Sequence, residues 1–154
     1  MFVVNLRLTK RRVALVLGAA AAVVLTIICF AKSGRVSYPD GSELNDRVAY
    51  LQKLGYSVKS ESETKTDIVI PSDFGGVYKQ YNKLQKKAGF NLEEFRKNGA
   101  VMYTYSVENF KDKSEVYANL LVHNGKIIGG DISSIENGGF TLPLVNIELN
   151  LGDH

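Results

Sequence analysis

The feature that most constrains this chain is an uninterrupted hydrophobic segment near its N-terminus. Residues 13–31 read VALVLGAAAAVVLTIICFA and include no charged residue. As an α-helix, these about 19 residues span roughly 28 Å, which is close to the thickness of the hydrocarbon core of a bilayer. The segment is hydrophobic on every side, as membrane helices are and amphipathic core helices are not. We therefore predict a transmembrane helix over residues 13–31.

The charged residues beside this segment predict its orientation. Residues 10–12 are Lys-Arg-Arg, and no acidic residue occurs before residue 32. By the positive-inside rule, residues 1–12 form a cytoplasmic basic N-terminus. The rest of the chain then lies on the extracytoplasmic side of the cell membrane as the outer part of a single-pass protein. Two alternatives remain open: a signal peptide cleaved after Ala31, and a lipoprotein anchored through Cys29.

Charge is unevenly distributed along the chain, whose formal net charge is +3. The first 31 residues hold four of the 19 Lys and Arg and no acid, so the remaining 15 face all 16 Asp and Glu. A nucleic-acid-binding domain needs a basic surplus, and we predict no nucleic-acid partner. Cys29 is the single cysteine, which excludes an intramolecular disulfide. The domain must therefore be stabilised by its hydrophobic core.

Two amphipathic helices are predicted after a linker at residues 32–41, which contains glycine, serine and proline and shows no periodicity. The first helix covers residues 42–54, with Ser42 as its N-cap and apolar residues at helical spacing. The second covers residues 72–88 and carries a stronger apolar stripe. Gly55 and Gly89 follow the two helices, where a left-handed residue commonly ends a helix.

Strands are predicted between and after these helices. Residues 56–62 and 66–70 are expected to form a strand or hairpin, and residues 91–98 a helical turn. Alternating apolar residues predict three further strands at residues 101–107, 115–123 and 126–134. The tail at residues 141–151 is a weaker candidate for an edge strand.

Two dipeptides that contain glycine refine this prediction. Asn124-Gly125 lies between the last two strands, and both residues tolerate the positive φ that a type I′ hairpin turn requires. Gly129-Gly130 lies inside the final strand and predicts a bulge or a close packing contact. The predicted fold class is α+β: an N-terminal transmembrane helix followed by an extracytoplasmic domain at residues 42–154. In that domain two amphipathic helices pack on one face of a mostly antiparallel sheet.

The residues offer no familiar cofactor, metal or catalytic motif. Apart from the terminal His154, the domain has only His123, which we expect to be a solvated turn residue, and it contains no cysteine, so we predict neither metal nor cofactor. Residues 62–65 match the SxxK pattern of penicillin-recognising enzymes. That pattern is short, and the further motifs of those enzymes are missing, so we expect Ser62 to lie in solvent in a polar hairpin.

Acidic and aromatic residues supply the remaining candidates for a site. Glycoside hydrolysis uses two carboxylates that are paired in space, which a sequence alone does not reveal. The acidic candidates are Glu93, Glu94, Asp112, Asp131 and Glu136. Asp131 is the first of these to inspect because it lies beside Gly129-Gly130, although a strand-end acid that bonds to nearby backbone is the simpler interpretation. Four tyrosines either pack in the core or line a binding groove. These tyrosines are Tyr78, Tyr81, Tyr103 and Tyr105.

Several short segments of residues 46–140 resemble a bacterial family known only as a domain of unknown function, numbered forty-eight thirty. The segments that carry the resemblance are Arg47-Val48-Ala49-Tyr50-Leu51, Leu54-Gly55, Tyr81-Asn82, Leu84-Gln85, Gly89-Phe90, Tyr103-Thr104-Tyr105, Ala118-Asn119-Leu120-Leu121-Val122, Gly125-Lys126 and Ile128-Gly129-Gly130-Asp131. The resemblance implies a small membrane-anchored protein of Gram-positive bacteria. It assigns no catalytic residue, and the tail after Phe140 falls outside it.

The functional expectation is a non-enzymatic binding or accessory module. Its expected partners are the membrane, through one anchor helix, and an envelope protein or wall component. The candidate binding surface comprises Tyr78, Tyr81, Tyr103, Tyr105 and Asp131. The alternative is a small cell-envelope hydrolase acting on wall polymer.

Overall fold

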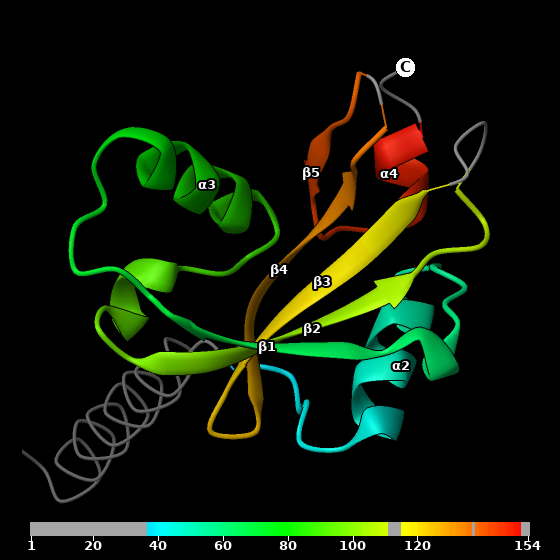
Figure 1. The fold of residues 1–154 in the computed structure, drawn as a ribbon, viewed down its shortest axis with the longest axis horizontal. Coiled ribbons are helices and arrows are strands. Elements are labelled where there is room, and N and C mark those ends of the chain that lie inside the picture. Colours follow the sequence, from blue (N-terminus) through cyan, green and yellow to red (C-terminus); the bar gives the residue numbers. More distant parts are fainter. Residues whose placement is uncertain (1–36, 111–114, 137, 152–154) are drawn as a thin grey trace, which may run out of the picture. The chain divides into compact units, whose positions relative to one another are not determined.

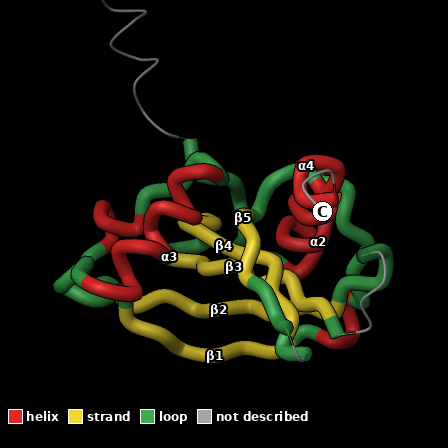
Figure 2. The backbone as a smooth tube through the Cα atoms, turned by 90° about the horizontal axis from the view of Figure 1, so that it is seen from above, coloured by secondary structure: helices red, strands yellow, loops and turns green. Residues whose placement is uncertain are grey.

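An antiparallel sheet of five strands organises the computed structural model, which describes residues 37–110, 115–136 and 138–151 (Figure 1). The strands are β1 Thr64–Val69, β2 Gly99–Ser106, β3 Val116–His123, β4 Lys126–Ser134 and β5 Thr141–Pro143. They lie side by side in chain order, and each neighbouring pair is antiparallel (Figure 2). The described residues from Tyr38 onward form one compact unit. The predicted α+β class and the antiparallel sheet are confirmed.

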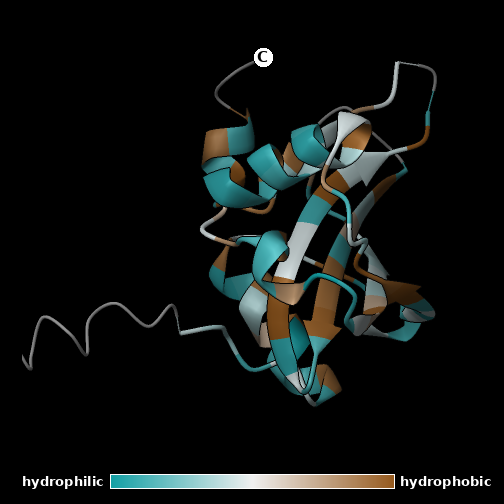
Figure 3. Cartoon of the chain, turned by 90° about the vertical axis from the view of Figure 1, so that its left-hand side faces the viewer, coloured by the Kyte–Doolittle hydropathy of each residue, from teal (hydrophilic) through white to brown (hydrophobic). Residues whose placement is uncertain are grey.

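Helices and short 3₁₀ turns connect these strands. The α-helices are α2 Leu44–Lys53, α3 Gly76–Lys87 and α4 Ile147–Leu151, and the 3₁₀ turns are η1 Ser60–Ser62 and η2 Leu92–Phe95. Hydrophobic residues gather in the strands, whereas the helices are mostly hydrophilic (Figure 3). This contrast is expected when helices cover a sheet and turn their polar sides to water.

The predicted transmembrane helix at residues 13–31 lies outside the residues that the structure describes, as does the cytoplasmic N-terminus at residues 1–12. Among the described residues, no helix is both long and apolar enough to cross a bilayer. The anchor and its orientation therefore stay predictions.

Both predicted helices are present, but each begins later than the sequence suggested. Glu43, not Ser42, precedes α2, and its backbone N–H donates to the Asp46 carboxylate at 3.2 Å. Ser42 instead donates its hydroxyl hydrogen to Asp40 at 2.6 Å. The second helix, α3, starts only at Gly76, whose φ is +52°. Glycine tolerates this conformation but weakens a helical first turn.

The helices do not share one face of the sheet, which corrects the predicted packing. Leu51 of α2 packs in a cluster with Leu120, whereas Tyr78 of α3 packs against a second cluster that includes Leu121. Because consecutive side chains of a strand point to opposite faces, the two clusters lie on opposite sides of β3. Figure 1 accordingly shows α3 and α2 on different sides of the strands. We call these sides the α2 face and the α3 face.

The predicted hairpin and bulge are both confirmed. Asn124 and Gly125 have φ values of 48° and 72° and form the turn between β3 and β4. The register then shifts, since Val122 pairs with Ile127 but Leu121 pairs with Gly129. A β-carbon on Gly130 would lie 2.4 Å from the backbone oxygen of Asn119, so only glycine fits this close packing.

Two segments differ from the predicted strands. Residues 56–62 form a single bridge, from Val58 to Val107, and then the turn η1, so the strand predicted there is wrong. In the tail, β5 is an edge strand as expected, but it ends at Pro143 and α4 follows. Asn150 of α4 is buried and donates to the Tyr56 hydroxyl at 2.8 Å. This tertiary contact stabilises a short helix where the alternation of Leu149 and Leu151 suggested a strand.

Candidate functional site

The α3 face of the sheet is polar over one part of its surface. At neighbouring positions the α2 face carries buried Tyr105, Ala118 and Ile132. The α3 face carries Thr104, Asn119 and Ser133 beside them, all partly exposed, and the buried Asp131. We call Tyr81, Thr104, Asn119, Asp131 and Ser133 the Asp131 cluster. It is the most connected polar group on this face, and we take it as the candidate site.

Hydrogen bonds join all five side chains of the Asp131 cluster. Asn119 donates its two amide hydrogens to Asp131 Oδ1 at 2.8 Å and to Ser133 Oγ at 3.0 Å. The amide oxygen of Asn119 accepts from the hydroxyl of Thr104 at 2.7 Å. From α3, the Tyr81 hydroxyl donates to Asp131 Oδ2 at 2.7 Å. The Asn119 amide therefore links three strands, and the Asp131 carboxylate joins them to α3.

Asp131 is 6% exposed, which is unusual for a carboxyl group without a basic partner. Burial raises its pKa, and the hydrogen bonds from Asn119, Tyr81 and Ser133 oppose that rise only in part. Burial, together with the neighbouring Asp131, also raises the pKa of Tyr81. Asp131 lies inside β4 and accepts from side chains, so the interpretation of a strand-end acid that bonds to backbone is wrong. No described cation neutralises it by an ion pair.

The five residues of the predicted binding surface fall into two groups. Tyr81 contacts Asp131 directly, and Tyr78 packs edge-on against Tyr81 at 6.2 Å between ring centroids. Tyr103 and Tyr105 lie on the α2 face instead. The structure therefore brings three of the five together. Whether these three bind a ligand stays a prediction.

Tyr103 and Tyr105 surround a buried arginine that the sequence analysis did not single out. Arg47 of α2 is 2% exposed and donates to Glu63 at 2.9 Å and to the Tyr105 hydroxyl at 2.8 Å. Its guanidinium also lies 3.7 Å from the ring centroid of Tyr103. Burial raises the pKa of Glu63, but the hydrogen bonds from Tyr105 and Arg47 outweigh that effect and hold the pKa below its usual value. This network fastens α2 to the sheet.

The SxxK match at residues 62–65 has a structural explanation. Ser62 donates to the backbone oxygen of Lys59 at 2.6 Å and accepts from the backbone N–H of Ser106 at 2.9 Å. Ser62 is partly exposed, so the expectation that it lies in solvent holds only in part; its hydroxyl also joins η1 to the end of β2. Both sides of the hydroxyl are engaged, which leaves no geometry for an activated nucleophile.

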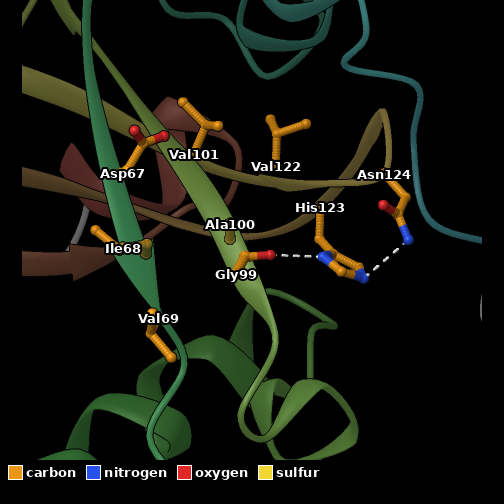
Figure 4. A pocket seen from close by; sticks show the side chains of 9 residues that line it. All are labelled: Asp67, Ile68, Val69, Gly99, Ala100, Val101, Val122, His123 and Asn124. Carbon is orange, nitrogen blue, oxygen red and sulfur yellow. Dashed lines mark hydrogen bonds between the residues drawn. The ribbon is translucent and has the colours of Figure 1, made fainter.

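A shallow groove of about 460 Å³ lies over the ends of β1, β2 and β3 (Figure 4). Val69, Val101 and Val122 line it, and Asp67 and His123 lie on different sides of it. His123 donates from Nδ1 to the Gly99 carbonyl at 2.6 Å and accepts from Asn124 at 3.0 Å. His123 is thus tied to the backbone and not simply solvated as predicted. No contact joins it to Asp67, so the groove lacks an acid–base pair.

The other acidic candidates are dispersed. Glu93 pairs with Lys86 and Arg96, and Glu94 accepts from the Tyr38 hydroxyl. Glu136 accepts from the backbone N–H of Glu115. Asp112 lies outside the described residues. Within the described residues, no three acidic, histidine or cysteine side chains gather in a way that would hold a metal ion.

Three cluster members were missed by sequence reasoning: Thr104, Asn119 and Ser133. A signal was available for Thr104 and Asn119, because each is a polar residue inside an otherwise apolar strand. Gln85 was missed in the same way: it is fully buried in α3 and exchanges two hydrogen bonds with the backbone of Gly130, at 2.9 and 2.8 Å. The Gln85 amide bonds both the N–H and the carbonyl of Gly130, which has no partner residue in β5.

Comparison with known proteins places this fold in a family. The family model described as Domain of unknown function (DUF4830) matches residues 50–132, which include α2 in part, β1 to β3 and most of β4. Four of the five residues of the Asp131 cluster lie within the match, and Ser133 lies just after it. Searches of curated proteins and of solved structures found no match. The chain belongs to the DUF4830 family, a domain of unknown function.

Proposed function

We propose that this chain is a single-pass membrane protein whose extracytoplasmic domain binds a polar component of the cell envelope through the Asp131 cluster. The uncharged segment at residues 13–31 and the basic residues before it support the anchor and its orientation. The observation that carries the binding role is the half-exposed polar network on the α3 face, centred on a buried carboxyl.

The chemistry of this surface fits a ligand rich in hydroxyl and amide groups, such as wall glycan or its stem peptide. Thr104, Asn119 and Ser133 are partly exposed and present hydroxyl and amide groups, which can both donate and accept. Tyr117 lies opposite Ser133 in the β3–β4 pair, so its half-exposed ring is on the same face. A flat aromatic ring beside fixed polar groups is a common arrangement in ligand sites.

Binding is favoured over hydrolysis by the number of carboxyl groups. The Asp131 cluster contains one, whereas glycosidases generally use two that lie about 5–10 Å apart. The hydrogen bonds also fix the carboxyl of Asp131 between Tyr81 and Asn119. A rigid, preorganised polar surface suits recognition because little side-chain freedom is lost on binding.

Nuclear magnetic resonance of the full-length chain in lipid nanodiscs tests this function. Soluble disaccharide-peptide fragments released from cell wall are titrated into the isotope-labelled protein. We expect the largest shifts at Thr104, Asn119 and Ser133. Tyr117→Ala should weaken binding at least fivefold, while Asn45→Ala on the exposed side of α2 should not.

Two results would contradict the proposal. The first is an absence of shifts on the α3 face at saturating fragment. The second is equal binding by Tyr117→Ala and the native chain, with shifts concentrated at the groove around Val101. Release of shortened fragments during the titration would instead support the hydrolase alternative.

A further inference from the structure

Four lysines form a continuous stripe on the outward side of α3. Lys79, Lys83, Lys86 and Lys87 are all exposed, and their spacing of four, seven and eight residues puts them on one side of the helix. The opposite side carries Tyr78, Tyr81, Asn82 and Gln85, which pack toward the sheet. We call the four lysines the lysine face; in Figure 3 hydrophilic residues cover much of the helical surface.

The lysine face stands out from an otherwise acidic domain. Residues 73–97 contain six Lys and Arg against three Asp and Glu, whereas the other described residues contain five against eleven. Within the described residues, only Lys86 of the lysine face has an ion pair, with Glu93 at 3.0 Å. The charge of Lys79, Lys83 and Lys87 is therefore free to act on a partner.

The chain enters the domain close to this helix. Tyr38, near the first described residue, stacks on Phe90 after α3 and packs edge-on against Phe95 of η2. Only residues 32–37 separate Tyr38 from the predicted membrane segment. Six extended residues reach about 20 Å, so an inserted anchor holds this side of the domain near the bilayer surface. Such a tether gives a high effective concentration, at which weak attraction suffices.

We propose that the lysine face docks on the anionic phospholipid headgroups of the membrane that holds the anchor. Phosphate groups complement the lysines in charge, and each ammonium group near an anionic surface adds attraction. The docking rests on the proposed anchor. It uses the outward side of α3, so the residues of the Asp131 cluster on β2, β3 and β4 are not part of the docking surface and can bind an envelope ligand.

The test uses the full-length chain in nanodiscs of phosphatidylcholine, with and without phosphatidylglycerol. A paramagnetic label on lipid headgroups reports which backbone amides lie at the surface. We expect selective broadening of residues 79–87 in the anionic discs, reversed by salt. Lys79→Gln/Lys83→Gln/Lys87→Gln should reduce the docking equilibrium constant about a hundredfold, at about fivefold for each lysine. The variant Lys53→Gln/Lys59→Gln/Lys126→Gln makes the same net-charge change elsewhere and should dock normally.

The outcomes separate docking from anchoring. Suppose that the chain enters the discs but residues 79–87 broaden equally with and without anionic lipid. The docking proposal is then wrong and the anchor stands. The same conclusion follows if these residues broaden as much in the triple variant as in the native chain. If the chain fails to enter the discs, the anchor is wrong and docking falls with it. In a further outcome, a soluble polyanion changes the signals of residues 79–87 while lipid composition does not. That result would assign the lysine face to a polymer and would also overturn the proposal.

Discussion

Replacing Arg47 with leucine removes the charged group that fastens α2 to the sheet. The guanidinium donates to Glu63, to the Tyr105 hydroxyl and to the backbone oxygens of Gly41 and Ser42, at 2.7 to 3.0 Å. Leucine fills much of the volume but makes none of these bonds. The variant therefore measures the polar contribution of Arg47 more than its packing contribution.

The expected loss of stability in Arg47→Leu depends on which partners the Glu63 carboxylate retains. Removing one partner of a buried ion pair costs about 3–5 kcal/mol because the other charge stays uncompensated. The Glu63 side chain is 14% exposed and retains Lys65 at 3.4 Å as well as the Tyr105 hydroxyl. We therefore expect the low end of that range, a loss of about 3 kcal/mol in the free energy of unfolding.

Urea unfolding of residues 37–154, followed by circular dichroism, measures this loss. For an m value of about 2 kcal/mol/M, the midpoint should fall by about 1.5 M with m unchanged. The exposed Lys53→Leu in the same helix should change stability by less than about 0.5 kcal/mol. The double variant Arg47→Leu/Glu63→Leu should be more stable than Arg47→Leu, because no buried charge is left alone. Simple addition of the two single losses would refute this reasoning.

Three further substitutions test local features by the same unfolding assay. Gly125→Val should cost about 1–2 kcal/mol, because φ is 72° and a β-carbon would lie 2.8 Å from Ser42 Oγ; unchanged stability would refute the turn. Ser62→Ala should cost about 1–2 kcal/mol by leaving the Ser106 N–H unpaired, and a neutral effect would mean that water replaces the hydroxyl. For Asp131, a pKa above its unfolded value means that the native state holds the extra proton, so stability falls as pH rises from about 4 through the folded pKa. Asp131→Asn should abolish that fall, and an unchanged pH profile would contradict the assignment.

Local chemistry made parts of this fold predictable. The β3–β4 hairpin follows from Asn124-Gly125, because the turn conformation depends on those two residues alone. Gly129-Gly130 marked a close approach for a similar reason. The helices followed from their apolar spacing, but that spacing shows only that one side is buried. It does not show which face of the sheet buries it, and α2 and α3 took opposite faces.

Long-range polar contacts account for most of what the sequence concealed. Arg47 and Glu63 are 16 residues apart and Gln85 and Gly130 are 45 apart, so neither pair forms a recognisable motif. Asp131 was singled out for its neighbouring glycines, but its partners Tyr81 and Asn119 come from other elements. Summing charge over the whole domain also hid the lysine face, because acids elsewhere in the chain balance it.

The most direct test of the account is the accessibility of both chain ends in intact cells from which the wall has been removed. A protease added outside should remove a C-terminal tag and leave an N-terminal tag protected, because residues 13–31 are proposed to cross the membrane once with the basic residues inside. Protection of both tags would contradict the extracytoplasmic domain. A mature protein that begins at Lys32 would contradict the retained anchor.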